Sequence, residues 1–309
     1  MACILAAAAL ASVAGARVEQ GKPLSGTVTA DGSSTVGPYA IAAAEGFRKR
    51  NPNARITVAI SGTGGGFERF CRNETDLQNA SRPMRDSEAI RCRDAGVKWI
   101  AFTVANDGLS VVVNRSNTWA NCLTVGELKK IWEPGSKVDN WNQVRDGFPN
   151  VPLKLFGAGT DSGTFDYFTE AINGRARASR SDYLATEDDN VIVTGVQGER
   201  GALGYFGFSY YEANKDKLKV LGVDGGKGGG CVTPSIATVQ ANKYRPLSRP
   251  LFIYAKRESF RRPVVAGYFG YIFNNEKAIA KQSGFIALTD RQLKKARYQY
   301  AQALKANNA

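Results

Sequence analysis

The chain has 309 residues, which is enough for two domains of ordinary size, each with its own core. Its hydrophobic content of 43% and charged content of 22% indicate a soluble globular protein. The formal net charge of +13 favours an anionic partner. The basic clusters at 48–50, 256–262 and 291–297 are interleaved with aromatic residues and do not form one dense stripe, so nucleic acid is not expected as that partner.

The absence of histidine excludes several kinds of active site. A Ser-His-Asp catalytic system and the common histidine-bearing zinc sites cannot form. No glycine-rich stretch fits G-x-x-x-x-G-K-[ST], which excludes a P-loop nucleotide hydrolase. No C-x-x-C spacing occurs either, so we expect neither a metal nor a redox cofactor. A Ser-Lys hydrolase remains formally open, with Lys154 as the lysine nearest to Ser162 in the sequence.

The first 16 residues are apolar and rich in alanine, and they end in an A-x-A pattern at residues 14–16. Such a pattern is typical of a signal-peptide cleavage site, although no Lys or Arg precedes the apolar stretch. The stretch is too short to span a membrane as a helix. Cys3 lies before the apolar run and not after it, so we favour export to the periplasm or cell surface over a lipid anchor, which stays open.

A strand-like run followed by a small-residue loop and the start of a helix occurs three times. Residues 27–30 lead into Asp31–Thr35 and then a helix opened by Gly37 and Pro38, whereas 56–60 lead into Ser61–Gly66 and then a helix. The third instance has a strand over 153–156, a loop over 157–163 with Asp161 or Ser162 as N-cap, and a helix from Thr164.

Each of these helix starts is a candidate anion site. The first N–H groups of a helix lack an intrahelical partner and carry the positive end of the helix dipole. Loops of Gly, Ser and Thr at that point supply donors to an oxyanion. If the fold brings the three loops together, they form one donor-rich pocket. The alternative interpretation is ordinary capping and tight turns.

The rest of the chain alternates between predicted strands and helices. Apolar runs over 102–105 and 109–113 flank Asn106–Gly108, a natural place for the chain to cross between domains. Further expected elements are a helix opened by a capping box at Thr124–Glu127, a flexible loop over 224–230, a strand over 251–254, and helices over 264–282 and 290–305.

Eight segments in order resemble the PstS family, the phosphate-binding proteins of bacterial phosphate ABC transporters. Each glycine-rich segment is a weak signal alone, but eight in family order are specific. The segments are DGSSTVGP (31–38), SGTGGGF (61–67), ETDLQNASRPM (74–84), NDGLSVVVN (106–114), LTVGELKKIW (123–132), GTDSGTFDYF (159–168), EDDN (187–190) and GALGYFGFSYY (201–211).

The resemblance implies an α/β protein with the two-lobed periplasmic-binding-protein (type II) fold and a ligand in the cleft between the lobes. We expect a discontinuous first domain over 24–108 and 243–309 and a second domain over 109–242. A ligand held by both lobes favours the closed form. The loaded receptor, a monomer that is not an enzyme, would deliver phosphate to a membrane ABC permease.

Four cysteines remain when Cys3 is set aside, and an even number fits an oxidising compartment. Four cysteines allow three pairings. We predict Cys71–Cys92 and Cys122–Cys231, because each pair then lies within one proposed domain. Four separate buried thiols are the alternative.

The resemblance also implies a set of ligand-binding residues. Hydroxyl and backbone N–H donors come from both lobes, and one guanidinium engages two phosphate oxygens. The donors are Ser34, Thr35 and Thr63 in the first lobe and Ser162, Gly163 and Thr164 in the second, with Arg82 as the guanidinium.

The sequence departs from the best-known family members at two of these positions. Those members carry an aspartate at the position of Arg82 and an arginine at the position of Ala158. The carboxylate matters because phosphate near neutral pH still carries a proton and sulfate does not, so a buried acceptor selects phosphate. Asp107 is the first choice for this acceptor and Asp161 the second. Without an acceptor, sulfate, molybdate or another tetrahedral oxyanion becomes credible, and a phosphoesterase with a Ser or Thr nucleophile is a further alternative.

Overall fold

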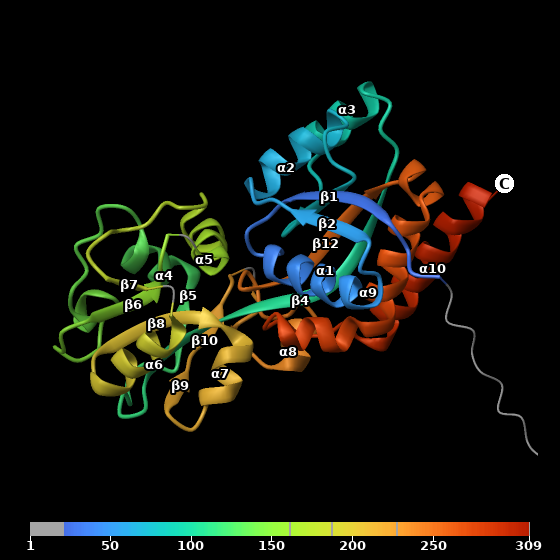
Figure 1. Cartoon of the computed structure of the whole chain (residues 1–309). Coiled ribbons are helices and arrows are strands. Elements are labelled where there is room, and N and C mark those ends of the chain that lie inside the picture. The colour runs from blue at the N-terminus through green and yellow to red at the C-terminus, as the bar shows by residue number, and fades with distance from the viewer. Residues whose placement is uncertain (1–21, 161, 187, 227, 309) are drawn as a thin grey trace, which may run out of the picture.

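A computed structural model of the chain describes residues 22–160, 162–186, 188–226 and 228–308. Figure 1 shows two lobes that are joined by the long strand β4 (Trp99–Asn114). The predicted signal-peptide segment and Asp161 lie outside the described residues. Among the described residues, no helix has the length and apolar character needed to cross a membrane.

The first lobe contains the N-terminal part of the chain and its last two helices. In Figure 1, α2 and α3 lie on one side of its strands, and α1 and α9 lie on the other. Its elements are β1 (Gly26–Gly32), α1 (Gly37–Arg50), β2 (Ala54–Val58), α2 (Gly62–Cys71), β3 (Leu77–Ala80), α3 (Asp86–Asp94), β12 (Ser248–Lys256), the 3-10 turn η2 (Glu258–Arg261), α9 (Pro263–Gln282) and α10 (Asp290–Asn308).

The second lobe contains the middle of the chain. Its elements are β5 (Cys122–Thr124), α4 (Val125–Trp132), the 3-10 turn η1 (Trp141–Gln143), β6 (Lys154–Ala158), α5 (Gly163–Asn173), β7 (Leu184–Thr186), α6 (Asp189–Gly198), β8 (Ala202–Gly207), α7 (Phe208–Asn214), β9 (Leu218–Val220), β10 (Gly222–Asp224), β11 (Cys231–Val232) and α8 (Ile236–Gln240).

One sheet runs through both lobes in the order β2-β1-β3-β12-β4-β8-β6-β7, with β9 also paired to β4. Strand β1 is parallel to β2 and β3, and β6 is parallel to β7 and β8. Parallel strands present their carboxyl ends at the same edge of a sheet, which is where ligands bind in open α/β sheets. The loops that follow β1, β2 and β3 therefore emerge together.

Each lobe has its own hydrophobic core. In the first lobe, the ring of Phe102 on β4 contacts Phe269 and Phe273 on α9, with ring centroids 4.7 and 5.5 Å apart. In the second, the Trp132 ring on α4 contacts Phe168 on α5 and Tyr205 on β8 at 5.6 and 5.0 Å. These separate clusters agree with two domains, but the boundaries near residues 108 and 243 stay a prediction.

Both predicted disulfides are present. Cys71–Cys92 joins α2 to α3, and Cys122–Cys231 joins β5 to β11. The cysteine pairing that was predicted from the proposed domains is therefore confirmed, and each bond ties together elements of a single lobe.

Asn106–Gly108, the predicted place for the chain to cross between domains, lies within β4, the strand that joins the lobes in Figure 1. The Asn106 N–H donates to Ile286 O, its carbonyl accepts from Ile286 N, and β12 pairs along the other edge. Backbone pairing on both edges keeps this crossing point in a strand conformation. The capping box at Thr124 is confirmed: Thr124 Oγ1 accepts from Glu127 N at 3.1 Å, and Glu127 Oε2 accepts from Thr124 N at 2.8 Å.

Candidate ligand-binding site

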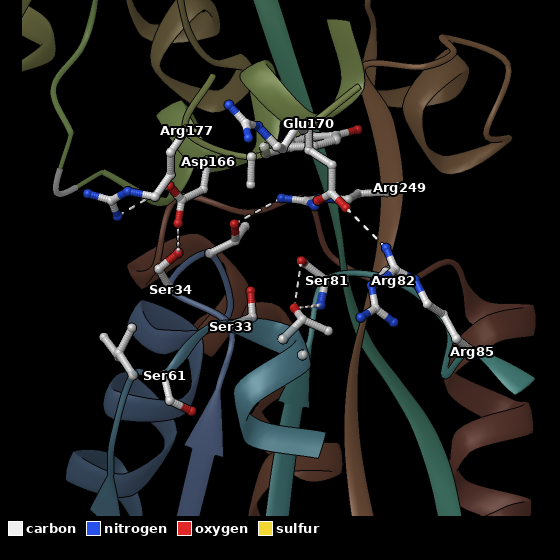
Figure 2. Close-up of a pocket in the computed structure, with 18 of the residues that line it drawn as sticks. Ser33, Ser34, Ser61, Ser81, Arg82, Arg85, Asp166, Glu170, Arg177 and Arg249 are labelled. Carbon is white, nitrogen blue, oxygen red and sulfur yellow. Dashed lines mark hydrogen bonds and ion pairs between the residues drawn. The ribbon is translucent and has the colours of Figure 1, made fainter. Parts of the chain in front are cut away.

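A cavity of about 740 Å³ lies between the lobes. The loops after β1, β2 and β3 line it from the first lobe, and α5 with the loop after it lines it from the second. Figure 2 shows Ser33, Ser34, Ser61, Ser81 and several arginines around this space. Hydroxyl groups and guanidinium groups thus dominate its polar lining, which suits an anion.

The start of α2 faces the cavity, which Ser61, Gly62, Thr63 and Gly64 help to line. Ser61 is the N-cap of α2, and its side chain makes no capping hydrogen bond to the residues that the structure describes. The free N–H groups and the positive dipole end of a helix start attract an anion. Thr63 Oγ1 accepts from Ser81 N at 3.3 Å and lies 3.1 Å from Ser81 Oγ, so neighbouring side chains fix this hydroxyl.

Arg82 lines the cavity but already has a carboxylate partner. Its Nη1 and Nη2 donate to Glu88 Oε2 and Oε1 at 2.9 and 2.8 Å, and Glu88 also accepts from the Arg85 N–H at 2.8 Å. Burial alone would raise the pKa of Glu88, but these hydrogen bonds and the positive charge of Arg82 lower it overall. Glu88 therefore stays ionised and holds the Arg82 guanidinium in place.

A second arginine, Arg249 on β12, reaches the cavity from the strands between the lobes. Its Nη2 donates to Thr35 Oγ1 at 2.9 Å, and its Nε lies 3.4 Å from Asp107 Oδ2. Its guanidinium carbon lies 3.2 Å from the centre of the Tyr167 ring. Burial raises the pKa of Asp107, and the charge of Arg249 opposes that rise. The largely buried Arg249 guanidinium has one nearby carboxylate, and it is a strong candidate for a contact with a bound anion.

Two carboxylates of α5, Asp166 and Glu170, face the first lobe across the cavity (Figure 2). Ser34 Oγ donates to Asp166 Oδ2 at 3.1 Å, and Arg85 Nη2 lies 3.9 Å from Glu170 Oε1. Asp166 therefore places a carboxylate beside the predicted phosphate donors.

A direct contact between the lobes separates this cavity from a second one of about 400 Å³. Thr35 Oγ1 donates to Gly163 O at 3.0 Å, and a Cβ added to Gly163 would lie 2.6 Å from Thr35 N. The loop before α1 and the start of α5 thus meet without room for a ligand between them.

The predicted residues divide between the two cavities. Ser34 and Thr35 line both, Thr63 and Arg82 line the first, and Asp107, Ser162, Gly163 and Thr164 line the second. Ser162 is the N-cap of α5, and its Oγ accepts from Thr164 N at 3.1 Å. The structure therefore brings the three loops to one junction, but with Thr63 and Ser162 on opposite sides of the Thr35–Gly163 contact.

Sequence reasoning missed Arg249, Asp166 and Glu170. Asp166 lies within the GTDSGTFDYF segment, and Glu170 follows it at the i+4 spacing that places both on one helix face. This spacing in a predicted helix could have identified both carboxylates as neighbours from the sequence alone. Arg249 is 142 residues from Asp107 in the sequence, and no local pattern links them.

Comparison with known proteins places the chain in a family. Residues 17–276 match the PBP superfamily domain. The chain is 48% identical to the protein SphX of Synechococcus elongatus over 84% of this chain and 77% of that protein. It is 37% identical to the phosphate-binding protein PstS of Staphylococcus saprophyticus over 89% of this chain and 84% of the relative. A crystal structure of a possible phosphate-binding protein from Planctomyces limnophilus superposes with a TM-score of 0.88 at 46% identity, covering 91% of this chain and 99% of that one.

Two lobes joined by paired strands, with a cavity between them, define a substrate-binding protein with the two-lobed α/β fold of the PBP superfamily. Within that superfamily the chain belongs to the PstS family of phosphate-binding proteins. The family and the fold that the sequence predicted are both confirmed.

Proposed function

We propose that this protein is an extracytoplasmic receptor that captures inorganic phosphate between its two lobes and delivers it to an ABC permease. The observation that carries the proposal is the convergence of the α2 start, Thr35, Arg82 and Arg249 on one cavity between the lobes. Family membership supports the same ligand class. Helix-start N–H groups and guanidiniums together are a typical environment for a phosphate group.

Phosphate would be held by Ser34, Thr35, Thr63 and Arg82 from the first lobe, together with Arg249. Ser162, Gly163 and Thr164 would reach it from the second lobe once the Thr35–Gly163 contact opens. Thr35 Oγ1 currently bonds to Gly163 O and accepts from Arg249. A phosphate oxygen can replace Gly163 O as the acceptor from Thr35 Oγ1, and it can replace Thr35 Oγ1 as the acceptor from Arg249 Nη2. The ligand would then take the place of the lobe-to-lobe contact.

Selection of phosphate over sulfate requires a carboxylate that accepts the phosphate proton. Asp107 is the candidate predicted from the sequence, and it lies beside Arg249 on the second cavity. Asp166 is the candidate that the structure adds, since it lines the first cavity next to Ser34. We favour Asp166, because it lines the same cavity as Thr63 and Arg82, whereas Asp107 does not. Asp166 also has an arginine partner, Arg177 Nη1 at 3.6 Å, but that arginine is exposed, whereas Asp107 balances the charge of the largely buried Arg249.

Isothermal titration calorimetry with phosphate, sulfate and molybdate tests this function on the wild type and on Asp166→Asn and Asp107→Asn. We expect phosphate to bind most tightly. Asp166→Asn should bind phosphate more weakly and discriminate less against sulfate, because the amide offers a donor where sulfate needs one. Tighter sulfate than phosphate binding by the wild type would overturn the proposal. Unchanged selectivity in Asp166→Asn together with lost selectivity in Asp107→Asn would assign the acceptor to Asp107.

We infer that the receptor does not turn its ligand over. Ser162 Oγ acts as the cap of α5, and a nucleophilic role would also require a general base beside it. An aryl phosphate should therefore not be hydrolysed. Hydrolysis that disappears in Ser162→Ala would contradict this inference.

We also place the protein outside the cytoplasm, as a monomer with domains over 24–108 plus 243–309 and over 109–242. The A-x-A pattern at residues 14–16 and the two disulfides support export, since disulfides persist in oxidising compartments. Secretion of the full chain with removal of its first residues, followed by mass spectrometry of the mature protein, tests this placement.

A further inference from the structure

The net positive charge of this protein lies in the first lobe. Residues 22–108 and 243–309 contain 26 Lys and Arg against 12 Asp and Glu, whereas residues 109–242 contain 14 against 15. The first lobe thus carries a net charge of +14 and the second a net charge of −1. A phosphate site needs only a few positive groups, so binding of a small anion does not account for this asymmetry.

The C-terminal helix α10 presents part of this charge on one side, with three charges near its start and one near its end. Arg291, Lys294, Lys295 and Lys305 are exposed, and we call these four residues the α10 basic face. Their spacing of three, four and eleven residues, at 100° per residue, keeps all four on one side of the helix. Asp290 is the only acidic residue in α10.

The opposite side of α10 is packed into the protein. Ala296 and Ala303 are buried, and Leu293, Tyr300 and Leu304 pack against the core of the first lobe. The Tyr300 hydroxyl donates to Ala266 O on α9 at 2.7 Å. Because its apolar side is already covered, α10 cannot insert that side into a bilayer. Any partner must meet the basic face from outside.

One aromatic residue is exposed among the basic charges, on the side of α10 away from the turn η2, which meets the buried side of the helix through the rings of Phe260 and Tyr300. Tyr298 lies on the same side of α10 as the basic face and is 65% exposed. An exposed tyrosine among lysines is typical of residues at a membrane–water interface.

Figure 1 places the C-terminal end of α10 at the far side of the first lobe from the second lobe, whereas the start of the helix lies beside β4, where the side chains of Gln292 and Asn106 bond to each other. No residue of the α10 basic face lines the 740 Å³ cavity, so a partner bound to this face would leave that cavity accessible. It would also leave the second lobe free to move, since the second lobe has no net positive charge that would draw it to the same partner.

We propose that the α10 basic face docks the first lobe on an anionic lipid surface. The face runs along about 20 Å of a convex helix, from Arg291 to Lys305 at 1.5 Å per residue. It forms a row of flexible point charges with one aromatic residue, and it lacks the series of stacking rings that single-stranded nucleic acid binding uses. Lipid headgroups attract such a row through the sum of its charges, without any shaped pocket. The inference is independent of which anion the cleft binds.

Flotation of the full-length mature protein with vesicles tests the proposal. Vesicles of phosphatidylcholine mixed with phosphatidylglycerol should bind the wild type, and vesicles of pure phosphatidylcholine should not. Binding should fall steeply with added salt, because the charges are exposed and screened. Lys294→Glu/Lys295→Glu should lower vesicle binding by about tenfold or more, since each lost charge weakens attraction to the surface.

The matched control is Lys137→Glu/Lys154→Glu, which makes the same change in net charge at exposed positions of the second lobe. We expect this control to retain vesicle binding. Equal losses in both double variants, or no binding by the wild type, would overturn the proposal. Tighter binding to duplex DNA than to anionic vesicles would overturn it in favour of nucleic acid. Phosphate calorimetry on the same variants should give wild-type affinity, so failure of the docking proposal and failure of the receptor function are separately visible.

Discussion

Arg249 and Asp107 are paired directly across β12 and β4, the antiparallel strands that lie between the lobes. Arg249 Nε lies 3.4 Å from Asp107 Oδ2, and the side chains are only 11% and 7% exposed. Arg249 also donates to Thr35 in the first lobe and lies over the Tyr167 ring in the second. One buried ion pair therefore connects both lobes at the strands that join them.

We predict that Arg249→Ala weakens phosphate binding by about 2–5 kcal/mol, the usual cost of removing one member of a buried charge pair. The variant removes a cavity cation and leaves Asp107 buried without a counter-charge. Calorimetry measures the affinity, and urea unfolding measures the stability. Asp107→Asn is the companion variant, because it keeps the shape of the pair and the Arg249 cation and removes only the charge of the carboxylate. Wild-type affinity with reduced stability in Arg249→Ala would limit Arg249 to a structural role.

Arg82 gives a second prediction, which separates a ligand contact from a structural contact. Arg82→Ala should weaken phosphate binding by several kcal/mol, on the order of 2–5, because a charge-assisted contact in a partly desolvated site is lost. Glu88→Gln should not weaken binding, since it frees the guanidinium from its bidentate partner. Equal losses of affinity in the two variants would instead indicate that the intact Arg82–Glu88 pair is needed to shape the loop.

The elements that sequence analysis predicted correctly are those set by local patterns. The starts of α1 and α5, the Thr124 capping box and the strand before each loop depend on residues within about one helical turn. The start of α2 was predicted too late, because the helix begins at Gly62, inside the segment Ser61–Gly66 that was predicted as a loop. The division of the donors between two cavities depends on how closely Thr35 approaches Gly163, 128 residues away in the sequence. The pairing of Arg249 with Asp107 depends on β12 entering the sheet between β3 and β4. Neither relationship leaves a local signal.

Gly163 provides a third prediction because it lies against the backbone of the first lobe. A Cβ at this position would lie 2.6 Å from Thr35 N and 2.7 Å from Thr35 Cα. Backbone atoms cannot rotate away as a side-chain end can, so Gly163→Ala should hold the lobes apart at this point. Overpacking of this kind costs about 1–3 kcal/mol. Because the ligand takes the place of the Thr35–Gly163 contact, a weaker contact should raise phosphate affinity by up to a similar free energy.

Small-angle X-ray scattering of ligand-free Gly163→Ala should give a larger radius of gyration than the wild type. Gly126→Ala is the control, since the nearest atom to its added Cβ is Thr124 Oγ1 at an ordinary 3.8 Å. Wild-type scattering together with wild-type affinity in Gly163→Ala would show that the Thr35–Gly163 contact is not part of ligand capture.

The two disulfides should differ in how readily they are reduced. Cys71 and Cys92 are buried in the first lobe, whereas Cys231 is exposed and Cys122 is half-buried. Thiol–disulfide exchange requires access to a sulfur atom. Mild reductant on the folded protein, followed by alkylation and peptide mass spectrometry, should therefore label Cys122 and Cys231 first. Earlier labelling of Cys71 and Cys92 would show that the first lobe opens locally near α2 and α3.

Glu276 gives a prediction about pH. It lies in the first lobe and is 2% exposed, and its Oε1 accepts from Leu288 N at 2.6 Å. Burial raises the pKa of Glu276 above its ordinary value of 4.5. Between the unfolded and the folded pKa, the folded protein binds more protons than the unfolded chain, so this residue lowers stability as pH rises through that window.

Glu276→Gln should remove this penalty, because the amide does not ionise and its oxygen can still accept from Leu288. The free energy of unfolding of the variant minus that of the wild type should therefore increase as pH rises from about 4 toward neutrality, by up to about 1.4 kcal/mol for each unit that the pKa is raised. Urea unfolding of both proteins across this range measures the difference, with exposed Glu45→Gln as a control for loss of a charge. Taking the difference between variant and wild type cancels the contributions of carboxylates such as Glu88, whose lowered pKa acts with the opposite sign. A difference that stays constant with pH would mean that Glu276 does not titrate differently in the folded and unfolded states.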